Sequence, residues 1–207
     1  MNISNITAVG CLTRYESKVT QSGKSFNTQE NEKVNENKRL LGIGFLSSPN
    51  SNDKYGMRAE YAENYSNDNP VVKVTVQKGN DITEEYNINI NEIDPASATE
   101  IEMFALCNYA DANGMGTGGT FGSWQTLKYY QRNAADNGYF KMSDSMDNFR
   151  SLKQNWVAMV NRMMTDYMNS GLYKQGMDGK KLLSMFDKAD SILISQRDNG
   201  RIKNKGE

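Results

Sequence analysis

The stretch PVVKVTVQKGNDITEEYNINI, residues 70–90, decides the fold class. Side chains of alternating polarity run through 70–77 and again through 82–90. The apolar face of the first run carries Val72, Val74 and Val76, and that of the second carries Tyr86, Ile88 and Ile90. Alternation with a period of two, rich in β-branched and aromatic residues, is typical of half-buried strands. The tight-turn sequence QKGND lies between the runs, so the sequence predicts an antiparallel hairpin.

A third strand is predicted on the N-terminal side of this hairpin. In YGMRAEYAE, residues 55–63, Tyr55, Met57, Ala59 and Tyr61 fall on one face, with Arg58 and Glu60 on the other. The polar loop NYSNDNP joins this strand to the hairpin, and Pro70 opens its strand, where a missing N–H costs least. The expected sheet is a three-stranded antiparallel meander with one solvated face.

About four helices are predicted after the strands. The first, within 97–113, follows Asp94-Pro95 and a capping-box pattern from Ser97 to Glu100, and its wide apolar face indicates a largely buried helix. The second spans 123–136, and the longest runs from Ser143 to Gly171. The last covers DGKKLLSMFDKADSILISQR. Strands followed by helices predict an α+β fold in which the helices pack on one face of the sheet.

The chain divides into three parts by composition. Residues 1–53 are rich in Asn, Ser, Thr, Lys and Glu and predict a flexible polar arm, in keeping with a mean hydropathy of −0.74. The apolar segment LLGIGFL, 40–46, is an exception, either a short strand or a segment that docks on the domain, and its functional interpretation is a partner-binding peptide. Residues 54–196 are the α+β domain, and 197–207 are a tail expected to fray.

Composition also excludes several classes of function. The formal net charge of −1 and the pI of about 5.7 argue against nucleic-acid binding. The chain has no histidine, and Cys11 and Cys107 make no metal-ligand spacing, so we expect no metal, no cofactor and no catalytic residues, and lean away from an enzyme. No apolar run approaches the roughly 20 residues that span a bilayer. We therefore expect a cytoplasmic protein without membrane contact, with unconventional export left open.

The densest glycine stretch, DANGMGTGGTFGSW at 111–124, raises the question of a phosphate site. Gly114, Gly116 and Gly119 satisfy G-x-G-x-x-G, but a helix precedes them where a dinucleotide site needs a strand. No Gly-Lys-Ser/Thr occurs there, which excludes a P-loop. We interpret the stretch as a flexible connection whose following helix is capped by Ser123 or Thr120. The alternative is a small-ligand or anion site in loop 114–122 and the helix N-terminus, built from Gly116, Thr117, Gly119, Thr120 and Ser123.

Three further features have both a packing and a functional interpretation. The methionines at 159, 163, 164 and 168 form a stripe that indicates core, or else an adaptable partner groove. Cys107 lies on an apolar helix face, which favours an inert, buried thiol. Tyr129, Tyr130 and Trp124 either pack against the sheet or stack on a ligand.

Several segments carry a resemblance to a known family. YGMRAEYAE, NPVVKVTV, INEIDPASATEIEMFALCNYADANG and NGYF resemble a family of uncharacterised proteins, a domain of unknown function, from Gram-positive anaerobic bacteria. The resemblance covers roughly residues 54–140 and is most specific from Ile90 to Leu106. It implies a bacterial source and a shared α+β core, and it carries no activity, cofactor or site residue. Together with the composition, it leaves a non-enzymatic protein-interaction module with an unknown protein partner as the predicted function.

Overall fold

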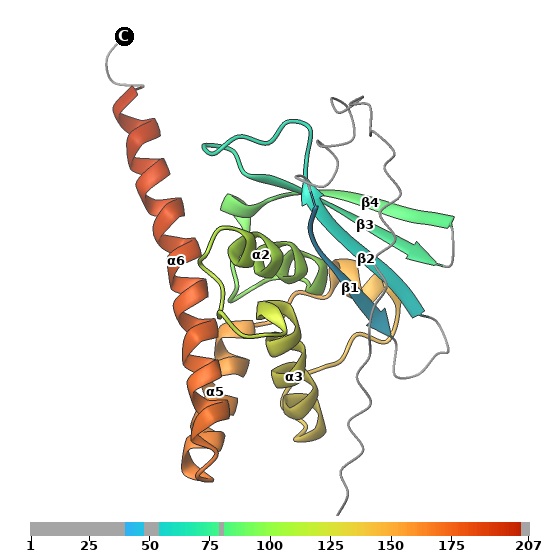
Figure 1. The fold of residues 1–207 in the computed structure, drawn as a ribbon, viewed down its shortest axis with the longest axis vertical. Helices are drawn as coiled ribbons and strands as arrows, with labels where there is room; N and C mark the ends of the chain where they lie inside the picture. Colours follow the sequence, from blue (N-terminus) through green and yellow to red (C-terminus); the bar gives the residue numbers. More distant parts are fainter. Residues whose placement is uncertain (1–39, 48–53, 79–80, 204–207) are drawn as a thin grey trace, which may run out of the picture.

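The computed structural model describes residues 40–47, 54–78 and 81–203 (Figure 1). Cys11 and most of the polar arm lie outside these residues. The strands are β1 (Leu40–Ser47), β2 (Lys54–Tyr61), β3 (Val71–Lys78) and β4 (Asp81–Asn89), and they form one sheet in the order β1-β2-β3-β4. Each neighbouring pair is antiparallel.

The predicted meander of three strands is present as β2, β3 and β4, and the prediction was one strand short. In the centre of the sheet Val74 pairs with Ala59 on one side and with Tyr86 on the other. The fourth strand is β1, which forms from the apolar segment within 1–53. Its Leu46 is fully buried, so this segment belongs to the sheet and to the core.

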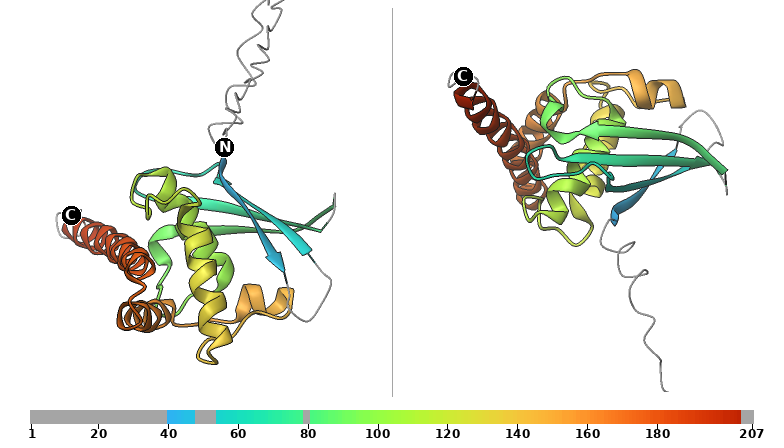
Figure 2. Two further views of the ribbon diagram at one scale, coloured as in Figure 1. Left: turned by 60° about the horizontal axis from the view of Figure 1, so that its bottom comes forward. Right: turned by 90° about the horizontal axis from the view of Figure 1, so that it is seen from above.

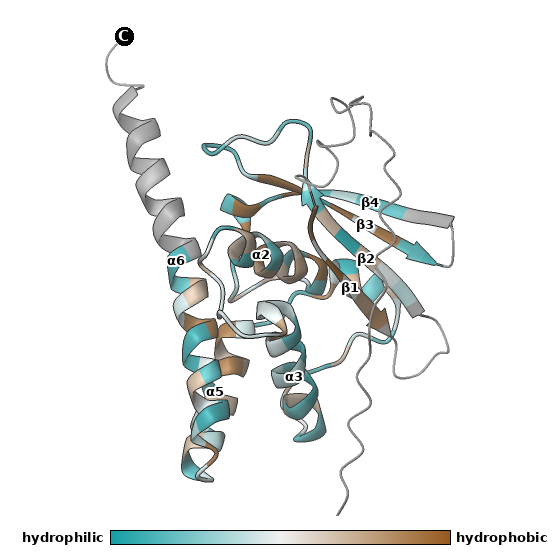
Figure 3. Cartoon of the chain, in the orientation of Figure 1, coloured by the Kyte–Doolittle hydropathy of each residue, from teal (hydrophilic) through white to brown (hydrophobic). Residues whose placement is uncertain are grey.

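Helix α2 (Glu100–Ala112) covers one face of the sheet. Among the helices of the described residues, it has the largest share of buried side chains. Two glycines of β1 allow this helix to come close. A Cβ atom added at Gly44 would lie 2.7 Å from Cε2 of Phe104, and one added at Gly42 would lie 1.8 Å from Oδ1 of Asn108. Figure 3 shows hydrophobic residues along β1 and β3, the strands that α2 contacts most.

The remaining helices complete the α+β fold. They are the short 3-10 helix η1 (Ile90–Glu92), α3 (Gly122–Asp136), α4 (Met146–Ser151), α5 (Trp156–Asn169) and α6 (Tyr173–Lys203). Helix α3 packs on α2 and α5, and α5 packs along α6. Both figures of the whole chain show α2 between the sheet and α6 (Figures 1 and 2). The α+β fold is thus as predicted, with α2 on the sheet and α3, α5 and α6 packed on one another beyond it.

Two helix boundaries differ from the prediction. Helix α2 begins at Glu100 and not at Ser97, because the capping box is formed by Thr99 and Glu102. The helix predicted from Ser143 to Gly171 is two helices, α4 and α5. Between them Gln154 makes a backbone bridge with Ala98, which holds this stretch extended.

The last helix is longer than predicted and is the longest of the described residues. Helix α6 begins at Tyr173 and continues to Lys203, so residues 197–203 of the expected tail are helical. Gly176 and Gly179 lie near its start, and because glycine is unfavourable inside a helix, the sequence pattern did not predict that the helix begins before them. A Cβ atom at Gly179 would lie 2.5 Å from the Tyr130 hydroxyl oxygen, so the glycine makes room for that tyrosine.

Candidate functional site

The glycine loop is closed by an aspartate from the preceding helix. The Ser123 N–H donates to Oδ2 of Asp111 at 2.7 Å, and the Ser123 hydroxyl donates to Oδ1 at 2.6 Å. The Thr117 N–H donates in turn to the Ser123 hydroxyl oxygen at 2.8 Å. The N-cap residue Phe121 makes no side-chain hydrogen bond, so the predicted cap by Ser123 or Thr120 is replaced by Asp111.

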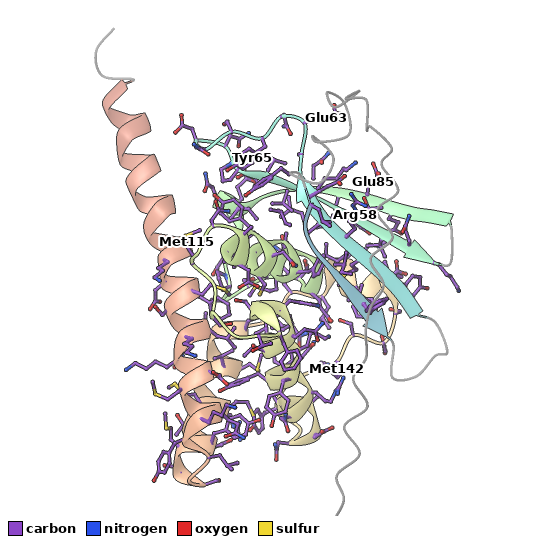
Figure 4. The ribbon with its side chains drawn as sticks, viewed as in Figure 1. Arg58, Glu63, Tyr65, Glu85, Met115 and Met142 are labelled. Carbon is purple, nitrogen blue, oxygen red and sulfur yellow. The ribbon has the colours of Figure 1, made fainter. Side chains whose placement is uncertain are left out.

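Some positions of this loop require glycine because of their backbone conformation, and others because a side chain would collide with a neighbour. Gly118 and Gly122 have φ of 67° and 73°, a region that side chains rarely adopt. A Cβ atom at Gly116 would lie 1.8 Å from Oδ1 of Asp111, so only glycine lets the carboxylate reach Ser123. The loop also inserts Met115 between α2 and α6, where it lines a small apolar cavity with Leu106 and Met185 (Figure 4).

The five residues of the alternative ligand site are therefore divided between interior and surface. Thr117 and Ser123 are buried and hydrogen-bonded to each other, while Gly119 and Thr120 are exposed and Gly116 is half-buried. The Asp111 carboxylate already accepts from the Ser123 N–H at the start of α3, and its negative charge disfavours an anion there. The ligand site stays a prediction, and this geometry weighs against it.

A second candidate is the free edge of the sheet at β1, which has no strand beyond it among the described residues. The outward side chains Ile43 and Phe45 are 68% and 69% exposed, although both are large and apolar. The whole strand, LLGIGFLS, contains no charged residue. Edge strands are usually protected by charges, proline or bulges. Edge strand β1 has one irregularity, between Leu40 and Gly42, and no other of these protections within its own residues.

The opposite edge of the sheet is protected in the ordinary way. Strand β4, DITEEYNIN, carries three acidic residues, and its Glu84 pairs with Arg150 at 2.9 Å. The two edge strands of this sheet therefore differ: β4 carries charged residues, and β1 carries none.

Charged residues on the outer face stop one strand short of β1. Glu60 of β2 accepts from Arg58 at 3.2 Å and from Lys73 of β3 at 3.0 Å. Burial by itself raises the pKa of Glu60, but its hydrogen bond to Lys73 and the two positive charges hold that pKa below its usual value. The same contact with Glu60 raises the pKa of Lys73. The paired charges leave the apolar side chains of β1 as a separate strip at the edge.

The other features singled out in the sequence have packing roles. Cys107 is fully buried, and burial raises the pKa of its thiol well above the usual value. Met159 and Met163 lie in the core, and Trp124 packs edge-on against Phe104. Tyr130 is buried, whereas Tyr129 is half exposed and stacks on Tyr167. Core packing accounts for Cys107, Met159, Met163, Trp124 and Tyr130, whereas Met164 and Met168 are half-buried at the margin of the core.

In the described part of the chain, no group of three or more His, Cys, Asp or Glu side chains is placed to hold a metal ion. Within the same residues, no helix is both long and apolar enough to cross a membrane. No protein-family model, curated protein or solved structure matches this chain.

Proposed function

We propose that this protein is a non-enzymatic interaction module that binds an extended segment of a partner protein along the free edge of β1. The observation that carries the proposal is the exposure of Ile43 and Phe45 on an edge strand without charge. A partner strand would hydrogen-bond to the outward N–H and C=O groups of β1 and extend the sheet. Main-chain hydrogen bonds then give affinity, and alternate side chains give specificity.

The partner's chemistry follows from what lies around β1. Ile43 stands opposite Arg58 and Phe45 opposite Gly56, so the strip is apolar at the edge and becomes charged one strand inward. A matching segment would be extended and would carry apolar side chains on the outer face, beside Ile43 and Phe45. The bacterial family, the cytoplasmic location and the unknown protein partner remain predictions from the sequence.

The proposed function is tested by comparing peptide binding to the wild-type chain with binding to a variant that carries charges on β1. The double variant Ile43→Lys/Phe45→Lys places lysines at two exposed positions of β1, where edge strands commonly carry them. Peptides selected for binding to the wild-type chain should lose at least about tenfold in affinity, or ~1.4 kcal/mol. Phe121→Lys is the matched control, because Phe121 is 81% exposed and belongs to the glycine loop and not to β1.

Hydrogen exchange locates the binding site. Bound peptide should slow amide exchange within residues 40–47, since outward N–H groups of β1 become hydrogen-bonded. Peptides that bind the double variant as tightly as the wild type, with exchange in β1 unchanged, would place any interaction surface elsewhere.

A further inference from the structure

A separate cleft lies where the chain passes from α3 to α5. It is bounded by residues 138–141, by residues 152–155 and by the first turns of α5, and its volume is about 580 Å³. Clefts of this size commonly hold small molecules. It shares no residue with β1 or with the glycine loop.

The charges around this cleft have one sign. Lys141, Lys153 and Arg162 line it, and no aspartate or glutamate does. None of the three has an ion pair with any carboxylate of the described residues. The acid one helical turn beyond Arg162 is Asp166, which accepts a hydrogen bond from the Tyr139 hydroxyl at 2.7 Å. The cleft therefore carries positive charge on a protein whose net charge is −1.

The walls of the cleft are held in place by specific contacts. The side chain of Gln154 accepts from the Lys141 N–H at 3.2 Å and donates to the Lys141 carbonyl at 3.1 Å, which joins the two bounding segments. The Arg162 guanidinium lies 3.7 Å from the centre of the Tyr139 ring. Stacking of this kind fixes the plane of a guanidinium and leaves its N–H groups available to an anion.

We propose that this cleft binds a small anion with two or more negative charges, of the diphosphate or tricarboxylate type. The three cations line one cleft without a carboxylate partner among the described residues, so a multiply charged anion could interact with more than one of them. Arg162 offers paired N–H donors, and the two lysines add point charges from the bounding segments. The inference does not depend on strand addition at β1.

Calorimetric titration of the full chain with pyrophosphate and with citrate tests the site, with acetate at matched ionic strength as the monovalent control. At least one of the two probes should bind more tightly than acetate. Arg162→Gln and Lys153→Gln should each weaken that binding by about tenfold, because each removes a charged donor. Lys153→Gln leaves the contact between Arg162 and Tyr139 intact, so it separates loss of charge from loss of packing.

Two controls distinguish this cleft from other positive or anion-accepting features. Arg132→Gln removes an exposed arginine of α3 outside the cleft and should bind as the wild type does. Gly119→Asp adds a negative charge to the glycine loop, where the nearest atom to a new Cβ is 3.8 Å away, and should also leave binding unchanged. The proposal is overturned if neither probe exceeds acetate, if Arg132→Gln weakens binding as much as Arg162→Gln, or if only Gly119→Asp abolishes it.

Discussion

At the scale of single residues, two glycines of β1 set the distance between the sheet and α2. Gly44 faces Phe104 and Trp124, and both of these side chains are buried. A methyl group at this position would lie 2.7 Å from Cε2 of Phe104 and 3.1 Å from Nε1 of Trp124. Aromatic rings inside a packed core have little room to move, so the added carbon strains the contact.

Gly44→Ala should therefore lower the free energy of unfolding by ~1–3 kcal/mol, the usual cost of overpacking a core. The matched control is Gly56→Ala in β2, where the only nearby atom is the Gln77 carbonyl oxygen, 4.0 Å from the new Cβ. That change should be neutral or stabilise by up to ~1 kcal/mol, because alanine reduces the entropy of the unfolded chain. Urea denaturation measures both. Equal effects of the two substitutions would show that β1 does not pack closely on α2.

At the scale of secondary-structure elements, a buried polar network joins α2 to α3 and to the segment before α4. Glu100 is 1% exposed and makes an ion pair with Lys128 of α3. Its other carboxylate oxygen accepts from Gln131 at 3.2 Å and from the Ser143 hydroxyl at 2.9 Å. The negative charge also lies in the first turn of α2, where the helix dipole favours it.

Removal of one charge from this network should cost more than removal of both. Lys128→Met leaves the Glu100 carboxylate buried without its cation, and should destabilise by roughly 3–5 kcal/mol. The double variant Glu100→Gln/Lys128→Met should recover part of that loss, because no buried charge is left unpaired. Chemical denaturation of the two singles and the double forms a cycle that measures the coupling. Strictly additive losses would mean that the Glu100 and Lys128 charges act independently.

The elements also show how far sequence patterns predict this fold. Strands β2, β3 and β4 alternate clearly, so their hairpin and meander could be predicted. Strand β1 could not be placed, because Gly42 and Gly44 take inner positions while Ile43 and Phe45 take outer ones, which removes the alternation. The break between α4 and α5 depends on the bridge from Gln154 to Ala98, a contact distant in sequence.

The candidate surfaces were predictable to different degrees. LLGIGFL stood out as an apolar run in a polar segment, and the interpretation as a partner-binding peptide followed from that contrast. The cationic cleft gave no local signal, since Lys141, Lys153 and Arg162 are spread over three segments and meet only in the folded chain. The Asp111 closure of the glycine loop was missed for a similar reason, because it joins residues 12 positions apart.

At the scale of the whole molecule, β1 is part of the sheet and of the core, so a domain boundary at residue 53 lies too late in the chain. Leu46 is fully buried, and the glycines of β1 lie against Phe104 and Asn108 of α2 and Trp124 of α3. Loss of the strand would expose these groups as well as the edge of β2. Burial of one leucine alone contributes ~1.5–3 kcal/mol.

Two truncations place this boundary. A chain without residues 1–39 keeps β1 and should melt within ~2–4 °C of the full chain, a change of at most about 1 kcal/mol for a domain of this size. A chain without residues 1–53 loses β1, and its melting temperature should fall by about 10 °C or more, because several kcal/mol of buried contacts are lost. Scanning calorimetry compares them, with a chain lacking 204–207 as the control for truncation itself. If both N-terminal truncations melted together, near the full chain, β1 would contribute nothing to stability. The strand would then be a docked peptide that a partner could displace, whereas a large difference makes β1 a fixed edge on which a partner strand adds.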